Sequence, residues 1–269
     1  MPRAINYARL PTEQSNPRSR FLDQLSGEQI LRLINREDRA VPQAVAKTLP
    51  HVARAASLIV RSLQRGGRLF FLGAGTSGRL GVIEAAECPP TFNTPPSMVQ
   101  AIIAGGRRAV FRSQEGAEDD RRRARQEVLR RVRSGDVVVG IAASGVTPFV
   151  EAGLLTAKRQ GAAAVLLACN QRARTRSKVD VAITPQVGPE LITGSTRLKA
   201  GTATKLILNM LTIATMVKLG KVYGNLMIDV RPTSRKLTAR AVRIIQTLGG
   251  VSPQRARQLL RQAHGGVKP

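Results

Sequence analysis

The stretch from Phe71 to Phe92 reads FLGAGTSGRLGVIEAAECPPTF. Apolar residues run up to Gly73, and a loop of Gly, Thr and Ser then opens a segment of helical character. A buried strand followed directly by a helix is the repeating unit of open parallel α/β sheets. The stretch therefore predicts a strand, a tight glycine-rich turn and a helix.

Four other short apolar runs have the length and composition of buried strands. Together with Arg68–Gly73, they are Met98–Ile103, Asp136–Ala142, Ala162–Ala168 and Asp180–Thr184. Helical segments are expected between them, at Arg79–Glu87, Asp120–Arg133 and Pro148–Gln160. This alternation predicts an α/β fold: a three-layer α-β-α sandwich around a five-stranded parallel sheet that is doubly wound.

Further helices are expected on both sides of this unit. Before the first strand they are Ser26–Asn35 and Val41–Leu63; after the last strand they are Ala200–Leu219, Arg235–Thr247 and Ser252–His264. Ser26, followed by Glu28 and Gln29, is a typical helix start. We therefore divide the chain into an N-terminal helical segment (1–58), a central domain (59–221) and a basic C-terminal helical segment (222–269).

The charge of the chain is strongly positive. Among 269 residues, 43 Lys and Arg stand against 17 Asp and Glu, which gives a formal net charge of +26. Such a balance raises the question of nucleic-acid binding. Aromatic residues make up only 3 %, with no Trp, which argues against a base-stacking platform. The basic residues are spread along the chain, so an Arg-rich version of an ordinary fold explains them more simply.

Composition also limits the other classes of protein. No run approaches the ~20 apolar residues of a membrane span, and the start of the chain has no apolar leader. Two cysteines, Cys88 and Cys169, and two histidines, His51 and His264, fit no metal-ligand spacing or disulfide framework. We therefore expect a soluble protein of a reducing compartment such as the cytoplasm, without a haem, iron–sulfur or structural zinc site.

The glycine-rich turn is the first candidate binding site. Gly73, Gly75 and Gly78 match G-x-G-x-x-G, but the expected acidic residue about 20 positions on is missing, which argues against a dinucleotide. A phosphate fits better, since Thr76, Ser77 and the amides around Gly78 would supply donors at a helix N-terminus. A tight turn that binds no ligand is the alternative.

Two further loops repeat this chemistry beyond the ends of strands. Ser144 and Thr147 follow the third strand, and Ser195, Thr196 and Lys199 follow the fifth. In an open α/β sheet, ligands bind at this edge. Each hydroxyl could instead cap a helix, which is the commonest role of Ser and Thr at such positions.

Carboxylates cluster at two places in this basic chain. Glu84 and Glu87 are three apart on the helix after the glycine loop, so they share a face, and Cys88-Pro89-Pro90 is expected to end that helix. The second cluster, EGAEDD, runs from Glu115 to Asp120. A Glu from each cluster over one pocket could supply an acid and a base. Helix capping or pairing with arginines is the alternative.

These motifs resemble those of the N-acetylmuramic acid 6-phosphate etherases, a family of the sugar isomerase (SIS) fold group. The resemblance runs from about residue 12 to about residue 249. Its stretches are TEQSNPRSRFLDQLS, LINREDRAVPQAV, GAGTSGRLGVIEAAECPPTF, IAGG, EGAEDD, DVVVGIAASG, VGPELITGSTRLKAGTATKLILNML and GKVYGNLMIDV. It implies a SIS-type fold, a homodimer, no cofactor, and hydrolytic cleavage of the D-lactyl ether of N-acetylmuramic acid 6-phosphate in peptidoglycan recycling.

The resemblance also implies roles for single residues. Glu87 would protonate the departing lactate oxygen, and Glu118 would remove the sugar C2 proton and help activate water, although the two roles could be exchanged. An acid that works near neutral pH must be shielded from water, so Glu87 is expected to be desolvated. Thr76 and Ser77 would hold the phosphate, with Ser144 and Thr147 as a second group. Ser195, Thr196 and Lys199 are further candidates for phosphate or sugar.

The chain departs from the family pattern at three places. Val146 stands in ASGVTPF where the family has Arg in ASGRTPY. The turn Cys169–Arg174 replaces a CNPGS-like sequence, and family members usually continue into a longer helical C-terminal part. Val146 replaces a side chain that could orient the substrate or bridge subunits.

Three other functions remain open at this point. A non-catalytic phosphosugar sensor, like the animal glucokinase regulatory proteins, would use the same pocket without the chemistry. A nucleic-acid-binding SIS regulator would usually carry an N-terminal helix-turn-helix, whereas this N-terminus matches the etherase pattern. A phosphosugar isomerase often uses a His for ring opening, and both His51 and His264 lie outside every motif.

Overall fold

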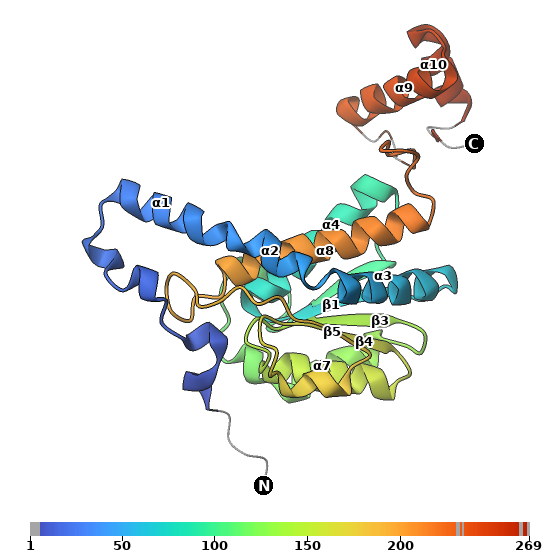
Figure 1. The fold of residues 1–269 in the computed structure, drawn as a ribbon. Helices are drawn as coiled ribbons and strands as arrows, with labels where there is room; N and C mark the ends of the chain where they lie inside the picture. The colour runs from blue at the N-terminus through green and yellow to red at the C-terminus, as the bar shows by residue number, and fades with distance from the viewer. Residues whose placement is uncertain (1–5, 230–231, 233, 264–265, 268–269) are drawn as a thin grey trace.

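The computed structural model describes residues 6–229, 232, 234–263 and 266–267 (Figure 1). At its centre is one parallel sheet in the order β2-β1-β3-β4-β5. The strands are β1 (Leu69–Gly73), β2 (Val99–Ile103), β3 (Val137–Ile141), β4 (Ala163–Leu167) and β5 (Val181–Ile183). The predicted five-stranded α/β fold is therefore confirmed, and each expected strand lies where its apolar run stands.

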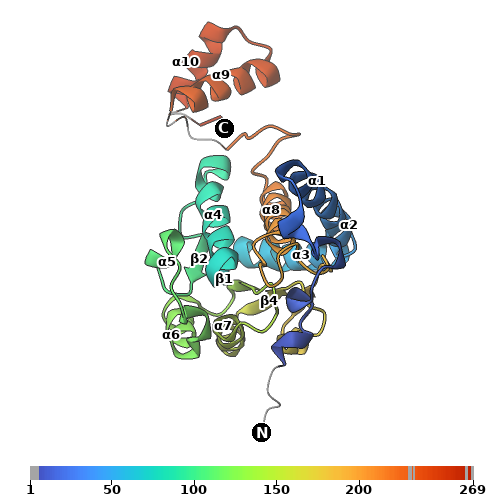
Figure 2. The ribbon, with the colours of Figure 1, turned by 90° about the vertical axis from the view of Figure 1, so that its left-hand side faces the viewer.

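Helices cover both faces of this sheet (Figure 2). On one face pack α3 (Leu49–Gln64), α4 (Gly75–Phe92) and α8 (Lys199–Lys218), and on the other α6 (Arg121–Arg131) and α7 (Pro148–Arg159). Successive side chains of a strand point to opposite faces, so Phe71 enters the first core while Phe70 and Leu72 enter the second. Burial on both faces explains why the strands read as continuous apolar runs.

The first helix of the chain, α1 (Gly27–Asp38), begins as the sequence predicts. Ser26 Oγ accepts from the Gln29 N–H at 3.3 Å, and Gln29 Oε1 accepts from the Ser26 N–H at 2.8 Å, which forms a capping box. The expected single helix Val41–Leu63 is wrong, because the structure has α2 (Ala40–Ala46) and then α3. Pro50 lies in the first turn of α3, where its missing N–H costs nothing.

The expected end of α4 at Cys88-Pro89-Pro90 is also wrong. The helix continues through both prolines to Phe92 and ends at Asn93, which adopts the left-handed conformation (φ 52°). A proline ring fixes φ near its helical value, but inside a helix it removes an N–H donor and crowds the carbonyl four residues earlier. With the C-terminal half of α4 packed in the core through Cys88 and Phe92, the backbone keeps its helical path.

The remaining elements are short or lie at the two ends of the chain. They are α5 (Arg108–Phe111), α9 (Arg235–Gly249), α10 (Pro253–Gln262), and the 3-10 segments η1 (Tyr7–Arg9), η2 (Pro11–Glu13), η3 (Pro17–Ser19), η4 (Leu22–Gln24), η5 (Ala117–Asp119) and η6 (Arg174–Lys178). The hairpin of α9 and α10 has its own small apolar cluster and lies beyond the ends of α4 and α8 (Figure 2). His264 lies outside the described residues.

The N-terminal segment is tied to the loop that precedes α8. Ser19 Oγ donates to the Leu191 carbonyl at 2.7 Å, and the Gly194 N–H donates to the Thr12 carbonyl at 3.1 Å. In addition, the Lys199 ammonium lies 2.9 Å from Glu37 Oε2, and both side chains are buried. The amino end of α8 is thus held in place by residues from the start of the chain.

One described helix, α8, is long and apolar enough to cross a membrane, by length and composition only. No membrane span is expected from the sequence, and this helix does not by itself contradict that expectation, because a buried core helix passes the same test. More than half of its apolar window is buried against the protein, where it packs on α3 and α4 (Figure 1). This packing is that of the core helix of an α/β domain.

Candidate functional site

The strand order creates one obvious place for a ligand. The chain passes from β1 outward to β2 and then returns to β3 on the other side of β1, so the winding reverses between β1 and β3. In open α/β sheets, ligands bind outside the carboxyl ends of the strands at such a switch point. The glycine loop follows β1, and the Ser144 loop follows β3.

The glycines of the first loop are required by the fold itself. A Cβ on Gly73 would lie 2.7 Å from the Gly78 nitrogen, and a Cβ on Gly78 would lie 2.6 Å from Ile103 Cγ1. Gly75 has a φ of +53°, a conformation that other residues rarely adopt. A tight strand-to-helix turn alone therefore explains these glycines, and a ligand must be argued from other atoms.

Those atoms are the donors at the start of α4. Its N-cap residue, Ala74, has no side chain that can cap the first turn. Within the part of the chain that the structure describes, the hydroxyls of Thr76 and Ser77 make no hydrogen bond, and both side chains are only half-buried. The free amides, two hydroxyls and the positive end of the helix dipole form a site suited to an anion.

The second loop, which carries Ser144 and Thr147 between β3 and α7, has a backbone fixed by its neighbours. Asn170, which is buried, donates from Nδ2 to the Ser144 carbonyl at 2.8 Å and thereby fixes the loop backbone. Gly145 has a φ of +73°, and a Cβ there would lie 2.6 Å from Ala173 Cβ. Thr147 is the N-cap residue of α7, yet its side chain accepts no capping hydrogen bond. Its hydroxyl is therefore available to a ligand.

In the third loop, the loop before α8, Lys199 and the neighbouring amides are already bonded to other residues of the chain. The buried Glu190 carboxylate accepts from the amides of Lys199 and Ala200, both at 2.9 Å, so it caps the amino end of α8. Burial raises the pKa of Glu190 despite these two hydrogen bonds. The Lys199 ammonium is held by Glu37, so substrate binding by Lys199 would have to break or share a buried ion pair. That assignment stays a prediction.

Ser195 and Thr196 are half-buried and lie near the glycine loop. The Thr76 methyl carbon is 3.9 Å from the position of a Cβ on Gly201, in the first turn of α8, and the Thr196 carbonyl is 3.6 Å from it. The first and third loops therefore meet at this edge of the sheet, as the sequence predicts. Whether Ser195 and Thr196 bind substrate stays a prediction.

Glu118 lies at the glycine loop. With Gly75 and Arg79 it lines a cavity of about 120 Å³ between the start of α4 and the loop after α5. Arg79 was missed by the sequence reasoning: its Nε donates to the Val110 carbonyl at 3.0 Å and joins α4 to α5. The sequence does contain a signal for Arg79, because a basic residue two positions after Ser77 lies in the first turns of a helix expected to bind an anion.

Glu87 is not part of this cavity. At about 1.5 Å per residue it lies roughly 18 Å along α4 from Gly75, and its side chain is exposed, against the expected desolvation. Glu84, one turn earlier, is buried instead: Thr212 Oγ1 donates to it at 2.5 Å and Lys205 Nζ at 3.0 Å. The two glutamates therefore differ in role, because Glu84 joins α4 to α8 and Glu87 faces away from the chain's own core.

Neither cysteine has the properties of a nucleophile. Burial, followed by the charges of Glu84 and Glu87, raises the pKa of Cys88 to about 12, and burial raises the pKa of Cys169 to about 12. Both thiols are therefore protonated at neutral pH. Among the residues with described positions, no group of three or more His, Cys, Asp or Glu side chains could hold a metal ion.

Comparison with solved structures supports the fold. A phosphoheptose isomerase from Neisseria gonorrhoeae matches with a TM-score of 0.54 and 19 % identity, over 70 % of this chain and 97 % of that one. A phosphoheptose isomerase from Francisella tularensis matches with a TM-score of 0.53 and 20 % identity, over 70 % and 98 %. The family model of the glucokinase regulatory protein N-terminal SIS domain matches residues 51–158. These likenesses establish the SIS fold.

Comparison with curated proteins is more specific. The N-acetylmuramic acid 6-phosphate etherase of Symbiobacterium thermophilum is 51 % identical over 97 % of this chain and 87 % of its own length. The protein of the same name from Pasteurella multocida is 49 % identical over 100 % and 89 %. That from Salinibacter ruber is 52 % identical over 96 % and 84 %. The chain therefore belongs to the N-acetylmuramic acid 6-phosphate etherase family.

Proposed function

We propose that this protein hydrolyses the D-lactyl ether of N-acetylmuramic acid 6-phosphate to N-acetylglucosamine 6-phosphate and D-lactate, as a carbon–oxygen lyase of amino-sugar recycling. The observation that carries the proposal is identity near 50 % to etherases over nearly the whole chain. The site adds an uncapped helix N-terminus for a phosphate, with Glu118 beside it. A phosphosugar domain at 59–221 and a cytoplasmic location, where the two free cysteines would stay reduced, belong to the same proposal.

The reaction is an elimination followed by a hydration. Opening of the sugar ring exposes the C1 aldehyde, which acidifies the C2 proton. Glu118 removes this proton, the C3–O bond breaks, and the lactate oxygen takes a proton from Glu87. Water then adds across the C2–C3 double bond, with its hydroxyl at C3 and a proton returned to C2. General acid–base help of this kind typically contributes about 10²–10⁴-fold to the rate.

The first experiment is a coupled D-lactate assay with purified protein and N-acetylmuramic acid 6-phosphate. We expect lactate to appear with N-acetylglucosamine 6-phosphate in equal amounts. A folded protein that binds the sugar phosphate without releasing lactate would overturn the etherase proposal. It would favour the phosphosugar sensor, for which Val146, in place of the family's Arg, is the one observation in the sequence.

The open amino end of α4 predicts a defect in substrate affinity for the Thr76→Val protein. Valine keeps the shape of threonine but removes the hydroxyl that would donate to the phosphate, so KM should rise about 10- to 100-fold, as for loss of a charge-assisted hydrogen bond of about 1.5–3 kcal/mol. Steady-state kinetics give the value. Thr202→Val is a matched control, since that hydroxyl donates to the Leu198 carbonyl on an exposed part of α8. Equal effects in both proteins would contradict the phosphate role.

We further propose a homodimer that pairs through the outer face of the helical layer formed by α3, α8 and α4. A groove of about 670 Å³ between these helices is lined largely by Ala53, Ala56, Val60, Ala214 and Val217. Ile213 and Val217 of α8 are about half exposed. A contiguous apolar face of this kind on a charged protein is typical of a subunit interface.

The exposed face of α4 supports a site shared between two subunits. Ile83, with 47 % of its surface exposed, lies one turn before Glu87 on the same face of the helix. In a single chain, Glu87 has neither the desolvation nor the proximity to Glu118 that the chemistry requires. Contact with a second subunit along α4 would bury Ile83 and bring each Glu87 to the glycine loop and Glu118 of its partner.

A further inference from the structure

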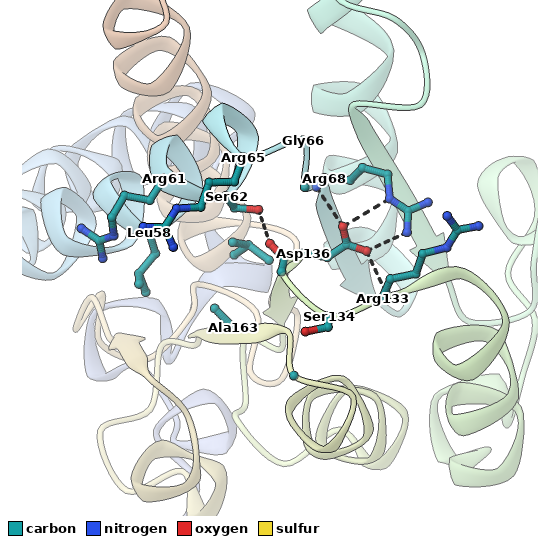
Figure 3. A pocket seen from close by; sticks show the side chains of 14 residues that line it. Leu58, Arg61, Ser62, Arg65, Gly66, Arg68, Arg133, Ser134, Asp136 and Ala163 are labelled. Carbon is teal, nitrogen blue, oxygen red and sulfur yellow. Dashed lines mark hydrogen bonds and ion pairs between the residues drawn. The ribbon is translucent and has the colours of Figure 1, made fainter.

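A larger cavity lies at the opposite edge of the sheet from the glycine loops. Its volume is about 410 Å³, and it is lined by the end of α3 and by the segments that lead into β1, β3 and β4 (Figure 3). These segments precede the strands, so the cavity lies at their amino ends. It is therefore separated from the candidate substrate site by the length of the strands.

Four arginines line this cavity: Arg61, Arg65, Arg68 and Arg133. Asp136 is the one carboxylate among the lining residues, and it already forms an ion pair with Arg68. Asp136 is only 2 % exposed and accepts from the Arg68 amide, Nε and terminal nitrogen at 2.9, 3.2 and 2.7 Å, and from the Arg133 amide at 2.8 Å. The lining therefore keeps a net charge of three positive.

The other three arginines are exposed, and their guanidinium groups have no partner among the described residues. No hydrogen bond or ion pair within the described residues uses the guanidinium of Arg61, Arg65 or Arg133. Arg61 lies in the last turn of α3 and Arg65 is the C-cap residue of that helix, so the same helix end carries both side chains. Like charges that are gathered without a counter-charge are relieved when an anion binds between them.

Hydrogen bonds join the segments that carry these arginines. Ser62 Oγ donates to the Gly135 carbonyl at 2.5 Å, which fixes the end of α3 to the turn before β3. In Figure 3, Arg61 and Arg65 lie on one side of Asp136, and Arg68 and Arg133 lie on the other. An anion on the first side meets the unpaired Arg61 and Arg65, and an anion on the second side meets the unpaired Arg133, because Arg68 is held by Asp136. An anion at the centre meets Asp136. The arrangement selects a ligand with two separated anionic groups.

We propose that this cavity binds a small phosphorylated metabolite with at least two phosphoryl groups, one at Arg61 and Arg65 and one at Arg133. Guanidinium forks match phosphate oxygens in geometry and in charge. The volume lies in the range of small-molecule sites, about 300–1,000 Å³. The lining has Leu58 and Ala163 but no aromatic side chain, so a nucleobase would find no stacking partner. Recognition rests on the phosphoryl groups alone.

The test uses inorganic tripolyphosphate and orthophosphate as probes in isothermal titration calorimetry with the full chain. Wild-type protein is expected to bind tripolyphosphate at least about tenfold more tightly than orthophosphate, and Arg65→Gln/Arg133→Gln should lose about tenfold or more of that affinity. Arg61 is left unchanged because it also lines the α3–α8 groove. The matched control is Arg122→Gln/Arg125→Gln, which removes the same charge from the exposed face of α6.

Three results would overturn the proposal. Equal loss in the α6 control would mean that only net charge attracts the probe. Loss of tripolyphosphate affinity in the Thr76→Val protein would place the probe at the glycine loop instead. Equal affinity for tripolyphosphate and orthophosphate would contradict a site with two separated anionic positions. Retained affinity in the α6 control and in Thr76→Val, with loss only in Arg65→Gln/Arg133→Gln, supports the cavity.

Discussion

Glu87→Gln and Glu118→Gln proteins are each expected to release lactate at about one thousandth of the wild-type rate or less, because each loses its proton-transfer group. A mixed dimer of the two variants should nevertheless recover about half of the wild-type rate, because in a C2 dimer with shared sites one of the two sites keeps both glutamates. If Glu87 and Glu118 acted within one chain, both sites of the mixed dimer would be inactive.

The mixed dimer can be isolated by co-expressing the two variants with different affinity tags and purifying through both. Lactate release per mixed dimer is then compared with that of each variant dimer. Val217→Asp is a useful companion, since Val217 is 45 % exposed and a charge there should split the dimer without disturbing the core. A monomeric Val217→Asp protein with full activity would contradict the shared site, as would an inactive mixed dimer.

The sequence predicts the sheet well because burial on two faces leaves a local signal. Every residue of β1 and of β3 is buried, and both strands read as unbroken apolar runs. Helix ends are predicted less well where local and tertiary preferences conflict. Pro50 starts a new helix, whereas Pro89 and Pro90 are carried inside one. Local rules for proline could not distinguish these cases, since packing of Cys88 and Phe92 decides the second.

The candidate site is predicted unevenly for a similar reason. Thr76 lies near the loop before α8, and Glu118 lies beside the glycine loop. Both placements follow from topology, which puts the carboxyl ends of parallel strands at one edge. The exposure of Glu87 could not be predicted, because the sequence pattern does not show which face of α4 the rest of the chain leaves uncovered. Lys199 was predicted as a ligand for an anionic substrate, but it pairs with Glu37. A partner that is 162 residues away in the chain leaves no local signal in the sequence.

The buried pair of Glu37 and Lys199 is expected to dominate the stability of the N-terminal region. Lys199→Met leaves Glu37 without its buried counter-charge, which should lower the free energy of unfolding by about 3–5 kcal/mol. Urea unfolding followed by circular dichroism gives the value. The control is Arg32→Gln, which removes an exposed i,i+4 pair with Glu28 and should cost less than about 0.5 kcal/mol. Similar losses in the two proteins would contradict a special role for the buried pair.

The same pair predicts how stability depends on pH. Burial alone raises the pKa of Glu37, but hydrogen bonds from Arg18, Lys199 and Asn16, with the charge of Lys199, lower it to about 2. A carboxylate with a depressed pKa stabilises the fold above its ordinary value of 4.5 and loses that contribution as pH falls toward 2. The stability gap between wild-type and Glu37→Gln proteins should therefore be about 3 kcal/mol at pH 7 and close as the pH approaches 2.

This pair also connects stability to the site. Glu37, Asn16 and Arg18 hold the N-terminal segment against Lys199, and the same segment contacts the loop at Leu191 and Gly194. That loop leads to Thr196, which lies near Thr76. Loosening the pair should therefore raise KM for the sugar phosphate before it unfolds the sheet, so Lys199→Met kinetics at 10 °C below its midpoint of thermal unfolding should show weaker binding with kcat nearly unchanged. A fall in kcat at constant KM would instead show that Lys199 takes part in the chemistry.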